Sequence, residues 1–173
     1  MSRRDAHGEY ILSDDPGSID VDAVHAFLTR SYWSEGIGED LVARAIAASL
    51  CYGIYGPVPG GVQVGFARVI TDTATFAYLC DVYVLEACRG RGLSKALMAF
   101  VLADPRLAGL RRFSLMTRDA HGLYERFGFR HMADPSRYME IARPGMYLAQ
   151  GPVSPGAAPV TPGRPLRSGG PPA

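Results

Sequence analysis

The feature that most constrains this fold is a long apolar strand that runs through a glycine-containing turn into a helix. Between Thr75 and Leu85 most residues are β-branched, aromatic or aliphatic on both faces, which is typical of a central strand covered on two sides. Gly90 and Gly92 follow this strand, and a helix is expected over Leu93–Ala103. This order predicts a mixed α/β sheet with helices on both faces.

Shorter elements flank this unit on both sides. Turn-rich segments and changes of hydrophobic period separate them along the chain. The expected strands are Tyr10–Ser13, Cys51–Tyr55, Val62–Ile70 and Phe113–Thr117, the expected helices are Asp20–Thr29, Gly38–Leu50 and Ala120–Phe127, and a closing hairpin is expected from Arg130–Met132 and Tyr138–Ile141. The chain has 173 residues, and we expect one domain over residues 1–150.

Residues 151–173 differ from the rest of the chain in composition. Pro, Gly, Ala and Ser dominate them, and their large apolar residues are Val153, Val160 and Leu166. Burial of so little apolar surface does not offset the entropy of ordering a chain, so we expect a disordered tail. The alternative role for this tail is that of a proline-rich ligand for a partner module.

Composition and charge exclude several classes of function. The net charge is +1, which provides no basic surface for nucleic acid. No run approaches the ~20 apolar residues of a membrane span, and no apolar segment follows the N-terminal arginines as it would in a signal peptide. The three cysteines include no CxxC pair, which argues against a disulfide framework and a metal site. We therefore expect a cytoplasmic, bacterial protein without a metal.

The turn after the long strand predicts a site for an anion. Its glycines let the backbone approach a ligand closely, and the N–H groups at Arg91–Lys95 point outward from a helix start. Arg89, Arg91 and Lys95 add positively charged donors. The pattern matches neither GxxxxGK(S/T) nor GxGxxG after a first strand, so two familiar phosphate loops are excluded. A solvated glycine turn is the alternative interpretation.

Two segments of the chain resemble the GNAT acetyltransferases, a family that uses acetyl-CoA. The pyrophosphate loop of that family, (R/Q)xxGx(G/A), is similar to Arg89–Ser94, which has serine at the last position. The segment TRDAHGLYERFGF, over Thr117–Phe129, resembles the family pattern NxxAxxLYxxxGF, with threonine in place of asparagine. The order of strands and helices over residues 10–141 fits the family throughout.

The resemblance implies how a cofactor would bind. In this fold the central strand separates from its neighbour at a bulge, and acetyl-CoA lies in the gap with its pantetheine paired to the strand backbone. Its pyrophosphate lies on the glycine loop. The residues that the resemblance places at the cofactor are Val82, Tyr83, Val84, Arg89, Gly90, Arg91, Gly92, Leu93, Ser94, Lys95 and Thr117.

The resemblance also implies catalytic residues. The family counterpart of Tyr124 protonates the departing thiolate as a general acid, whereas the alternative for Tyr124 is a packed helix tyrosine. Asp81 is a candidate general base because a carboxylate in an apolar strand is costly unless it is used, and a structural hydrogen bond is its alternative. His121 and His131 are weaker candidates for the base.

The acceptor pocket is expected in the segment between the first two helices. Trp33 and Glu35 lie there and suit a cationic amine, although a tryptophan that covers the core is the alternative. The predicted function is N-acetylation of a small primary amine by direct attack in a ternary complex. Acetylation of a protein N-terminus or lysine and a non-catalytic acyl-CoA sensor are the alternatives, and a homodimer is one option for assembly.

Overall fold

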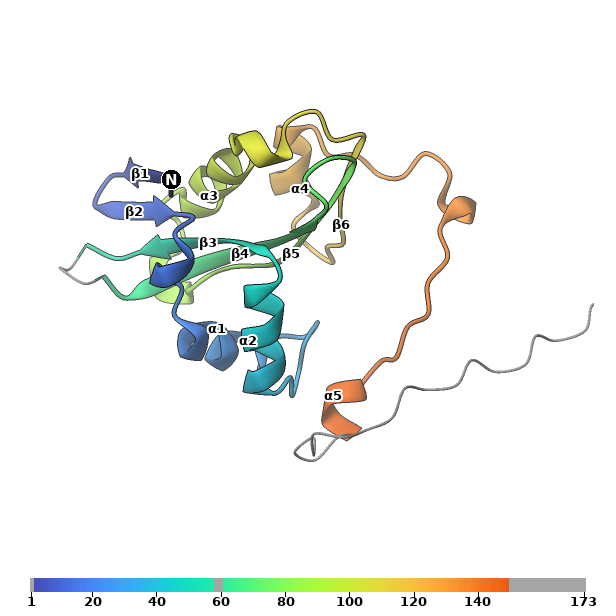
Figure 1. Cartoon of the computed structure of the whole chain (residues 1–173), viewed down its shortest axis with the longest axis horizontal. Helices are drawn as coiled ribbons and strands as arrows, with labels where there is room; N and C mark the ends of the chain where they lie inside the picture. Colours follow the sequence, from blue (N-terminus) through green and yellow to red (C-terminus); the bar gives the residue numbers. More distant parts are fainter. Residues whose placement is uncertain (1, 58–60, 150–173) are drawn as a thin grey trace, which may run out of the picture.

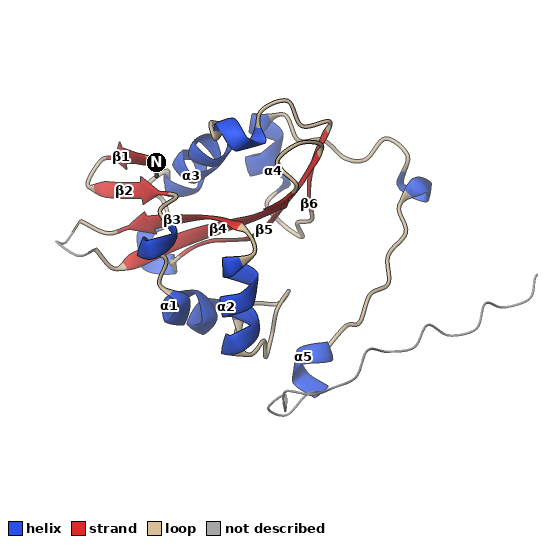
Figure 2. Ribbon diagram, in the orientation of Figure 1, coloured by secondary structure: helices blue, strands red, loops and turns tan. Residues whose placement is uncertain are grey.

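The computed structural model describes residues 2–57 and 61–149, and these form a six-stranded sheet with helices on both faces (Figures 1 and 2). In order across the sheet the strands are β1 (Arg4–His7), β2 (Tyr10–Ser13), β3 (Leu50–Tyr55), β4 (Gln63–Thr71), β5 (Phe76–Val84) and β6 (Arg112–Leu115). Neighbouring strands from β1 to β5 are antiparallel, and β5 and β6 are parallel. The predicted mixed α/β class is confirmed.

Helices cover the two faces unequally. The α-helices are α1 (Val21–Leu28), α2 (Glu39–Ala47), α3 (Leu93–Leu102), α4 (His121–Tyr124) and α5 (Met146–Ala149). Short 3-10 turns lie at Pro16–Ser18, Glu86–Cys88, Pro105–Leu107, Glu125–Phe127 and Pro135–Arg137. Figure 1 shows α3 and α4 on one face of the sheet and α1 and α2 on the other. Within the described residues, no helix has both the length and the apolar character that a membrane crossing requires.

Each face of the sheet has its own hydrophobic core. On the α3 face, Leu97 and Met98 are fully buried and belong to one cluster with Tyr52 of β3 and Leu79 of β5. On the other face the cluster contains residues of α1, α2, β4 and β5, namely Val24, Leu28, Val42, Phe66 and Tyr83. A central strand packed on both sides explains why the sequence of β5 is apolar on both faces.

The pairing of β5 changes along its length, and this change positions the functional site. Its first half pairs with β6 from Phe76 to Leu79, where β6 ends. Its second half continues to Val84 beside β4, with a register shift opposite Phe66 and Arg68. Asp81 lies in this bulge at φ +54°. A bulge re-aims side chains and increases local twist, so the two parallel strands separate beyond Leu79.

The sequence-based elements are confirmed with two exceptions and some shifted ends, the largest at the helix expected over Gly38–Leu50, which ends at Ala47, so that Leu50 begins β3. The strand β1 was not expected, because RDAH lacks the apolar alternation that marks a strand; backbone pairing with β2 defines it. The hairpin expected at Arg130–Met132 and Tyr138–Ile141 is wrong, because these residues form no strand. Asp134 instead caps a 3-10 turn that begins at Pro135, and the chain leaves the sheet there. The predicted tail, residues 151–173, lies outside the described residues, and the 1–150 boundary stays a prediction.

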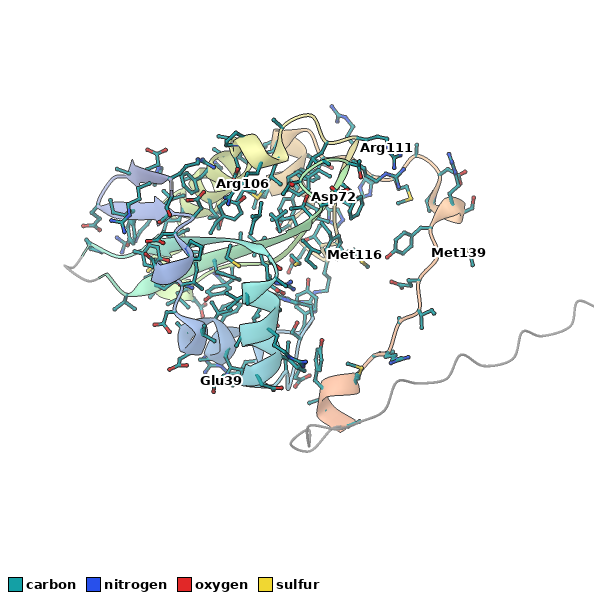
Figure 3. All side chains as sticks on the ribbon, in the orientation of Figure 1. Glu39, Asp72, Arg106, Arg111, Met116 and Met139 are labelled. Carbon is teal, nitrogen blue, oxygen red and sulfur yellow. The ribbon has the colours of Figure 1, made fainter. Side chains whose placement is uncertain are left out.

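A buried carboxylate fixes the end of α3 to the sheet. The Asp104 carboxylate is inaccessible to solvent, and its Oδ2 accepts hydrogen bonds from Tyr52 Oη at 2.8 Å and Arg106 Nη2 at 2.6 Å. Figure 3 shows Arg106 on this side of the molecule. Burial alone would raise the pKa of Asp104, but the bonds from Arg106 and Tyr52 outweigh it and lower the pKa to about 2.

We expect Asp104→Asn to lower the free energy of unfolding by about 3 kcal/mol at pH 7, because it removes the charge of a buried carboxylate that accepts hydrogen bonds from Arg106 and Tyr52. The difference in the free energy of unfolding between this variant and wild type should narrow as pH falls from about 4 toward 2. The reason is that the pKa of Asp104 is ~3.9 in the unfolded chain and lower in the folded protein. Urea denaturation across this pH range measures it. Asp40→Asn, which removes an exposed partner of Arg44, is the control and should change stability by less than about 0.5 kcal/mol. Equal effects of the two variants would contradict this role for Asp104.

Candidate active site

A cavity of about 820 Å³ opens where β5 and β6 separate. It lies between the second half of β5, the start of α3, the segment that leads into α4, and the loop between α1 and α2. Its walls are Phe27, Tyr32, Trp33, Tyr78 to Val84, Arg89, Ser94, Met116 to Ala120, Leu123 and Tyr124. Nine of the residues that the sequence predicts for the site are among them: Trp33, Asp81, Val82, Tyr83, Val84, Arg89, Ser94, Thr117 and Tyr124.

One edge of β5 faces this cavity with its backbone. On the β4 side, Tyr83 and Val84 pair with Phe66 and Gly65. On the other side, the pairing with β6 stops at Leu79, so no residue of the described β6 pairs with the backbone of Cys80–Val84. A strand edge of this kind binds an extended ligand through main-chain hydrogen bonds and requires no particular side chain.

The glycine turn places the start of α3 beside this edge. Gly90 and Gly92 have φ angles of +78° and +77°, a region that glycine adopts without a steric penalty. A Cβ at Gly90 would meet no atom within 4 Å, so this part of the loop is open to a ligand. The first amides of a helix lack acceptors within it. In α3 the amide of Lys95 donates to the carbonyl oxygen of Gly92 at 3.0 Å, whereas those of Leu93 and Ser94 donate to no backbone group of the described chain. Together with the helix dipole, they fit a phosphate group.

The charged residues of this turn differ in where they lie. Arg89 lines the cavity, and its Nε lies 3.4 Å from the carbonyl oxygen of Val84. Arg91 lies outside the cavity and is 3.5 Å from Glu9. Gly90, Gly92, Leu93 and Lys95 are likewise not among the residues of the cavity wall. Leu93 is buried in the core, so its backbone amide, and not its side chain, is available to a ligand.

Tyr124 reaches the cavity from the end of α4. Its side chain is buried, and burial raises the pKa of the phenol to about 12, with smaller contributions from Tyr32 and Asp119. A phenol with a raised pKa keeps its proton at neutral pH, which is the state that a general acid requires. Thr117 Oγ1 accepts a hydrogen bond from the amide of Ala120 at 3.0 Å, which fixes the turn that leads into α4.

Asp81 is engaged through both carboxylate oxygens. Its Oδ2 accepts a hydrogen bond from Arg68 Nε at 2.7 Å, and its Oδ1 accepts one from Trp33 Nε1 at 3.1 Å. The side chains of Asp81 and Arg68 are 7% and 16% exposed, so this ion pair is shielded from water. The sequence analysis missed Arg68, because nothing local indicates a partner thirteen residues away on another strand. This geometry favours the structural interpretation of Asp81.

The loop between α1 and α2 forms an aromatic wall. Trp33 contacts the edge of Tyr32, with ring centroids 4.9 Å apart, and the guanidinium of Arg118 lies 3.7 Å from the Tyr32 ring centroid. Phe27 stacks on Tyr83, with ring centroids 3.8 Å apart.

Glu35, which the sequence predicts as an acceptor residue, is exposed and lies outside the cavity wall. The sequence analysis missed Arg118, because its stacking on Tyr32 is a long-range contact.

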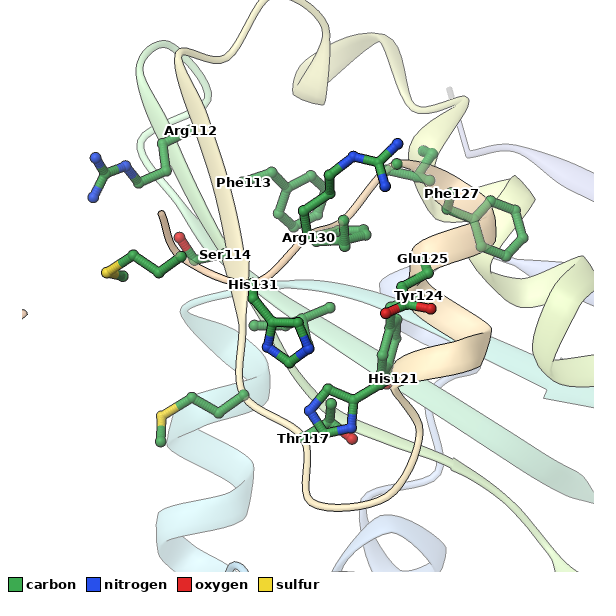
Figure 4. A pocket seen from close by; sticks show the side chains of 16 residues that line it. Arg112, Phe113, Ser114, Thr117, His121, Tyr124, Glu125, Phe127, Arg130 and His131 are labelled. Atoms are coloured by element: carbon green, nitrogen blue, oxygen red, sulfur yellow. The ribbon is translucent and has the colours of Figure 1, made fainter. Parts of the chain in front are cut away.

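The remaining candidates for a base or a nucleophile are two histidines outside this cavity and one cysteine on its wall. His121 and His131 stack on each other with ring centroids 5.2 Å apart, and they line a second cavity, of about 620 Å³, beside β6 (Figure 4). Cys80 lies on the wall of the first cavity, but burial raises the pKa of its thiol to about 12, which leaves little thiolate at neutral pH. Among the residues that the structure describes, no group of three or more metal-binding side chains gathers.

Comparisons with known proteins agree with this geometry. Residues 51–131 match the model of the acetyltransferase (GNAT) domain. A protein of Gibberella zeae assigned to the acetyltransferases is 33% identical over 137 residues, which cover 68% of this chain and 76% of that protein. A Xanthomonas campestris protein assigned to the GNAT family has a crystal structure that is 52% identical, with a TM-score of 0.76, over 80% of this chain and 96% of that one.

A more distant structure shares only the fold. It is a predicted acetyltransferase of Clostridium acetobutylicum solved with acetyl-CoA, which is 14% identical, with a TM-score of 0.54, over 82% of this chain and 96% of that one. The fold and these relatives together define an acyltransferase. The chain belongs to the GNAT family of acetyltransferases.

Proposed function

We propose that this protein transfers an acetyl group from acetyl-CoA to the primary amine of a small metabolite, by direct attack in a ternary complex. The observation that carries the proposal is that one cavity is lined by an unpaired strand edge, by Arg89 and Ser94, the residues on either side of the glycine turn before α3, and by a buried protonated phenol. These are the three groups that bind a pantetheine, bind a diphosphate and protonate a leaving thiolate.

These three groups define the proposed orientation of acetyl-CoA in the cavity. The pantetheine would pair with the backbone of Val82–Val84, and the pyrophosphate would lie on the amides of Gly90–Ser94 with Arg89 beside it. Thr117 borders the same channel on the side of α4. The acetyl-CoA in the Clostridium acetobutylicum structure supports this choice of co-substrate. The amine would enter from the opposite side, past Tyr32 and Trp33.

In the proposed reaction the amine nitrogen attacks the thioester carbonyl, a C–N bond forms and the C–S bond breaks. The leaving sulfur takes the phenolic proton of Tyr124, and the amine nitrogen gives up its proton to solvent water. The backbone amide near Val82 is the group that would stabilise the developing oxyanion. Asp81 acts in this proposal as a positioning residue, because its contacts hold Trp33 at the acceptor side.

We expect Asp81→Asn to shift the emission of Trp33, the only tryptophan of the chain, and to raise the KM for the amine several-fold. The buried Arg68 loses its charged partner, and the indole loses a charge-assisted acceptor. The pKa that governs the pH profile of kcat/KM should stay unchanged. Asp119→Asn is the control, since this carboxylate lines the same cavity but is 70% exposed. If instead the pH profile of kcat/KM loses its pH-dependent limb while the emission of Trp33 is unaltered, Asp81 is the general base.

The proposed activity is tested by release of CoA from acetyl-CoA, followed with a thiol reagent, across a panel of amines. The panel should contain small primary amines, amino acids, a peptide with a free N-terminus and a lysine-containing peptide. Turnover confined to small amines supports the proposal, whereas turnover with the peptides alone indicates a protein acceptor. Binding of acetyl-CoA without release for any amine would indicate a non-catalytic sensor.

We also propose that the protein acts in the cytoplasm. The support is chemical: Cys51, Cys80 and Cys88 are all free thiols, and this is the usual state of cysteines in a reducing compartment.

A further inference from the structure

The hairpin formed by β1 and β2 contacts the glycine turn before α3, and Figure 1 shows this hairpin beside α3. The imidazole Nε2 of His7, the last residue of β1, lies 3.1 Å from the main-chain carbonyl oxygen of Arg91. The Arg91 guanidinium lies 3.5 Å from the carboxylate of Glu9, and its Cζ is 5.9 Å from the ring centroid of Tyr10. The hairpin therefore contacts both the backbone and the side chain of one residue in the turn.

The contact of His7 is the most specific of these. A carbonyl oxygen is an acceptor, so Nε2 of His7 carries the proton and donates it. The side chains of Arg91 and Glu9 are 52% and 57% exposed, and an ion pair so open to water contributes little. The imidazole also lies against Gly92, where a Cβ would be 3.2 Å from Nε2, whereas a Cβ at Gly90 would meet no atom within 4 Å. His7 therefore covers one side of the turn and leaves the other side open.

The carbonyl group that His7 holds belongs to the peptide unit between Arg91 and Gly92. This peptide is trans, and in a planar trans peptide the C=O and N–H bonds point in opposite directions. With the carbonyl oxygen held toward the hairpin, the N–H of Gly92 points away from the hairpin. In the described part of the chain this amide donates to no backbone group. It is therefore available to a ligand on the side of the turn opposite His7.

A peptide unit between two glycines needs such a contact to keep one orientation. Gly90 and Gly92 stand on either side of Arg91, and glycine populates positive and negative φ about equally readily. The Arg91–Gly92 peptide could therefore turn over at low cost, which would place a carbonyl oxygen where the N–H now points. A carbonyl oxygen repels a phosphate, and donors that are fixed before binding lose less conformational entropy when the ligand arrives.

We propose that His7 is a positioning residue for the diphosphate of acetyl-CoA. Its Nε2–H holds the Arg91 carbonyl on the hairpin side and thereby directs the Gly92 amide toward the diphosphate. A hydrogen bond to the carbonyl also polarises the peptide unit, which makes its N–H a stronger donor. Arg91 then contributes its peptide to the site, while its side chain fastens the turn to Glu9. This inference rests on the proposed function, because it requires a diphosphate at this turn.

Calorimetric titrations of His7→Ala and His7→Gln with CoA, dephospho-CoA and pantetheine test the proposal. His7→Ala should weaken the binding of CoA by about five- to tenfold, the effect of one lost hydrogen bond. Dephospho-CoA should lose affinity by the same factor, because it keeps the diphosphate. Pantetheine lacks the diphosphate and should bind His7→Ala within about twofold of wild type. His7→Gln should recover most of the lost affinity, since the glutamine side chain also donates an N–H to a carbonyl.

His25→Ala is the matched control. The imidazole Nε2 of His25 also lies 3.1 Å from a main-chain carbonyl oxygen, that of Ile37, and both histidines are half-buried. This contact joins α1 to the segment before α2, away from the glycine turn. His25→Ala should lose about as much stability in urea denaturation as His7→Ala and keep the wild-type affinity for CoA. Equal losses of CoA affinity in the two variants would show a general effect of destabilisation and overturn the role of His7.

The titrations separate a failure of this inference from a failure of the proposed function. If wild type binds CoA and His7→Ala binds it equally well, or loses as much affinity for pantetheine as for CoA, the role of His7 is wrong and the proposed function stands. If wild type binds no CoA, both are wrong. The tautomer of His7 gives a readout without ligand: NMR correlations of the imidazole nitrogens at alkaline pH should place the ring proton on Nε2. A proton on Nδ1 would contradict the proposal.

Discussion

We expect Tyr124→Phe to lower kcat at least tenfold and to leave the Kd for acetyl-CoA within about twofold of wild type. The change removes only the phenolic oxygen, and the ring keeps its place beside Phe129, where the two centroids are 6.0 Å apart. Binding of the cofactor is assigned to backbone groups of β5 and α3, so it should persist. Steady-state kinetics and calorimetry measure the two quantities separately.

The matched control for this variant is Tyr55→Phe. Tyr55 Oη donates a hydrogen bond to the carbonyl oxygen of Ser18 at 2.9 Å, and Tyr55 is not part of either cavity beside β6 or β5. Loss of its oxygen should change stability slightly and turnover very little. If both variants retain the wild-type kcat, Tyr124 is a packing residue and another group protonates the sulfur.

If Tyr124 is the general acid, its raised pKa predicts how the activity depends on pH. Burial is the main cause of the shift to about 12, compared with ~10 for an exposed tyrosine. An acid is active in its protonated form, so a group with this pKa loses activity only as the pH rises toward that value. The fall of kcat at alkaline pH should therefore lie above the pH range in which an ordinary tyrosine titrates.

The second large effect is expected for Gly90→Ala, which should weaken the binding of CoA by about 30-fold or more, the equivalent of one lost hydrogen bond to a charged group at about 2 kcal/mol. Gly90 has φ +78°, which an alanine adopts only with strain, and a Cβ there would project into the open space next to the turn. That space is the one we assign to the diphosphate. Calorimetric titration of the variant with CoA measures the effect.

Gly109→Ala provides a closely matched control. Gly109 has φ +74°, and a Cβ there would also meet no atom within 4 Å, but it lies in the loop after Leu107, away from the α3 turn. Both variants should lose a similar stability, of about 1–2 kcal/mol, because the backbone strain is the same. Only Gly90→Ala should lose affinity for CoA. Equal affinities in the two variants would remove the turn from the binding site.

The sequence predicted the parts of the fold that depend on local pattern. The long apolar run of β5, the glycines after it and the helix α3 lie next to one another in the chain, so their composition and spacing were sufficient. Tyr124 and Thr117 were placed by a second local motif, and the structure puts both on the wall of one cavity with β5. Parallel pairing of β5 and β6 brings these two motifs together.

What the sequence could not predict depends on contacts between distant residues. Asp81 was a plausible base in an apolar strand, and only the fold shows that Arg68 and Trp33 occupy its two oxygens. Glu35 has the right charge for an amine, but its loop turns it outward, while Arg118 takes a place on the aromatic wall. The segment Tyr138–Ile141 has a strand pattern, yet it forms no strand in the fold.

The central claim is that the amides of the glycine turn bind a diphosphate next to the free edge of β5. Its most direct test is a pair of calorimetric titrations of the wild-type protein, one with CoA and one with pantetheine, which lacks the diphosphate and the nucleotide. We expect saturable binding of one CoA per chain and an affinity for pantetheine that is lower by about 100-fold or more. Equal affinities, or no binding of CoA, would contradict the claim.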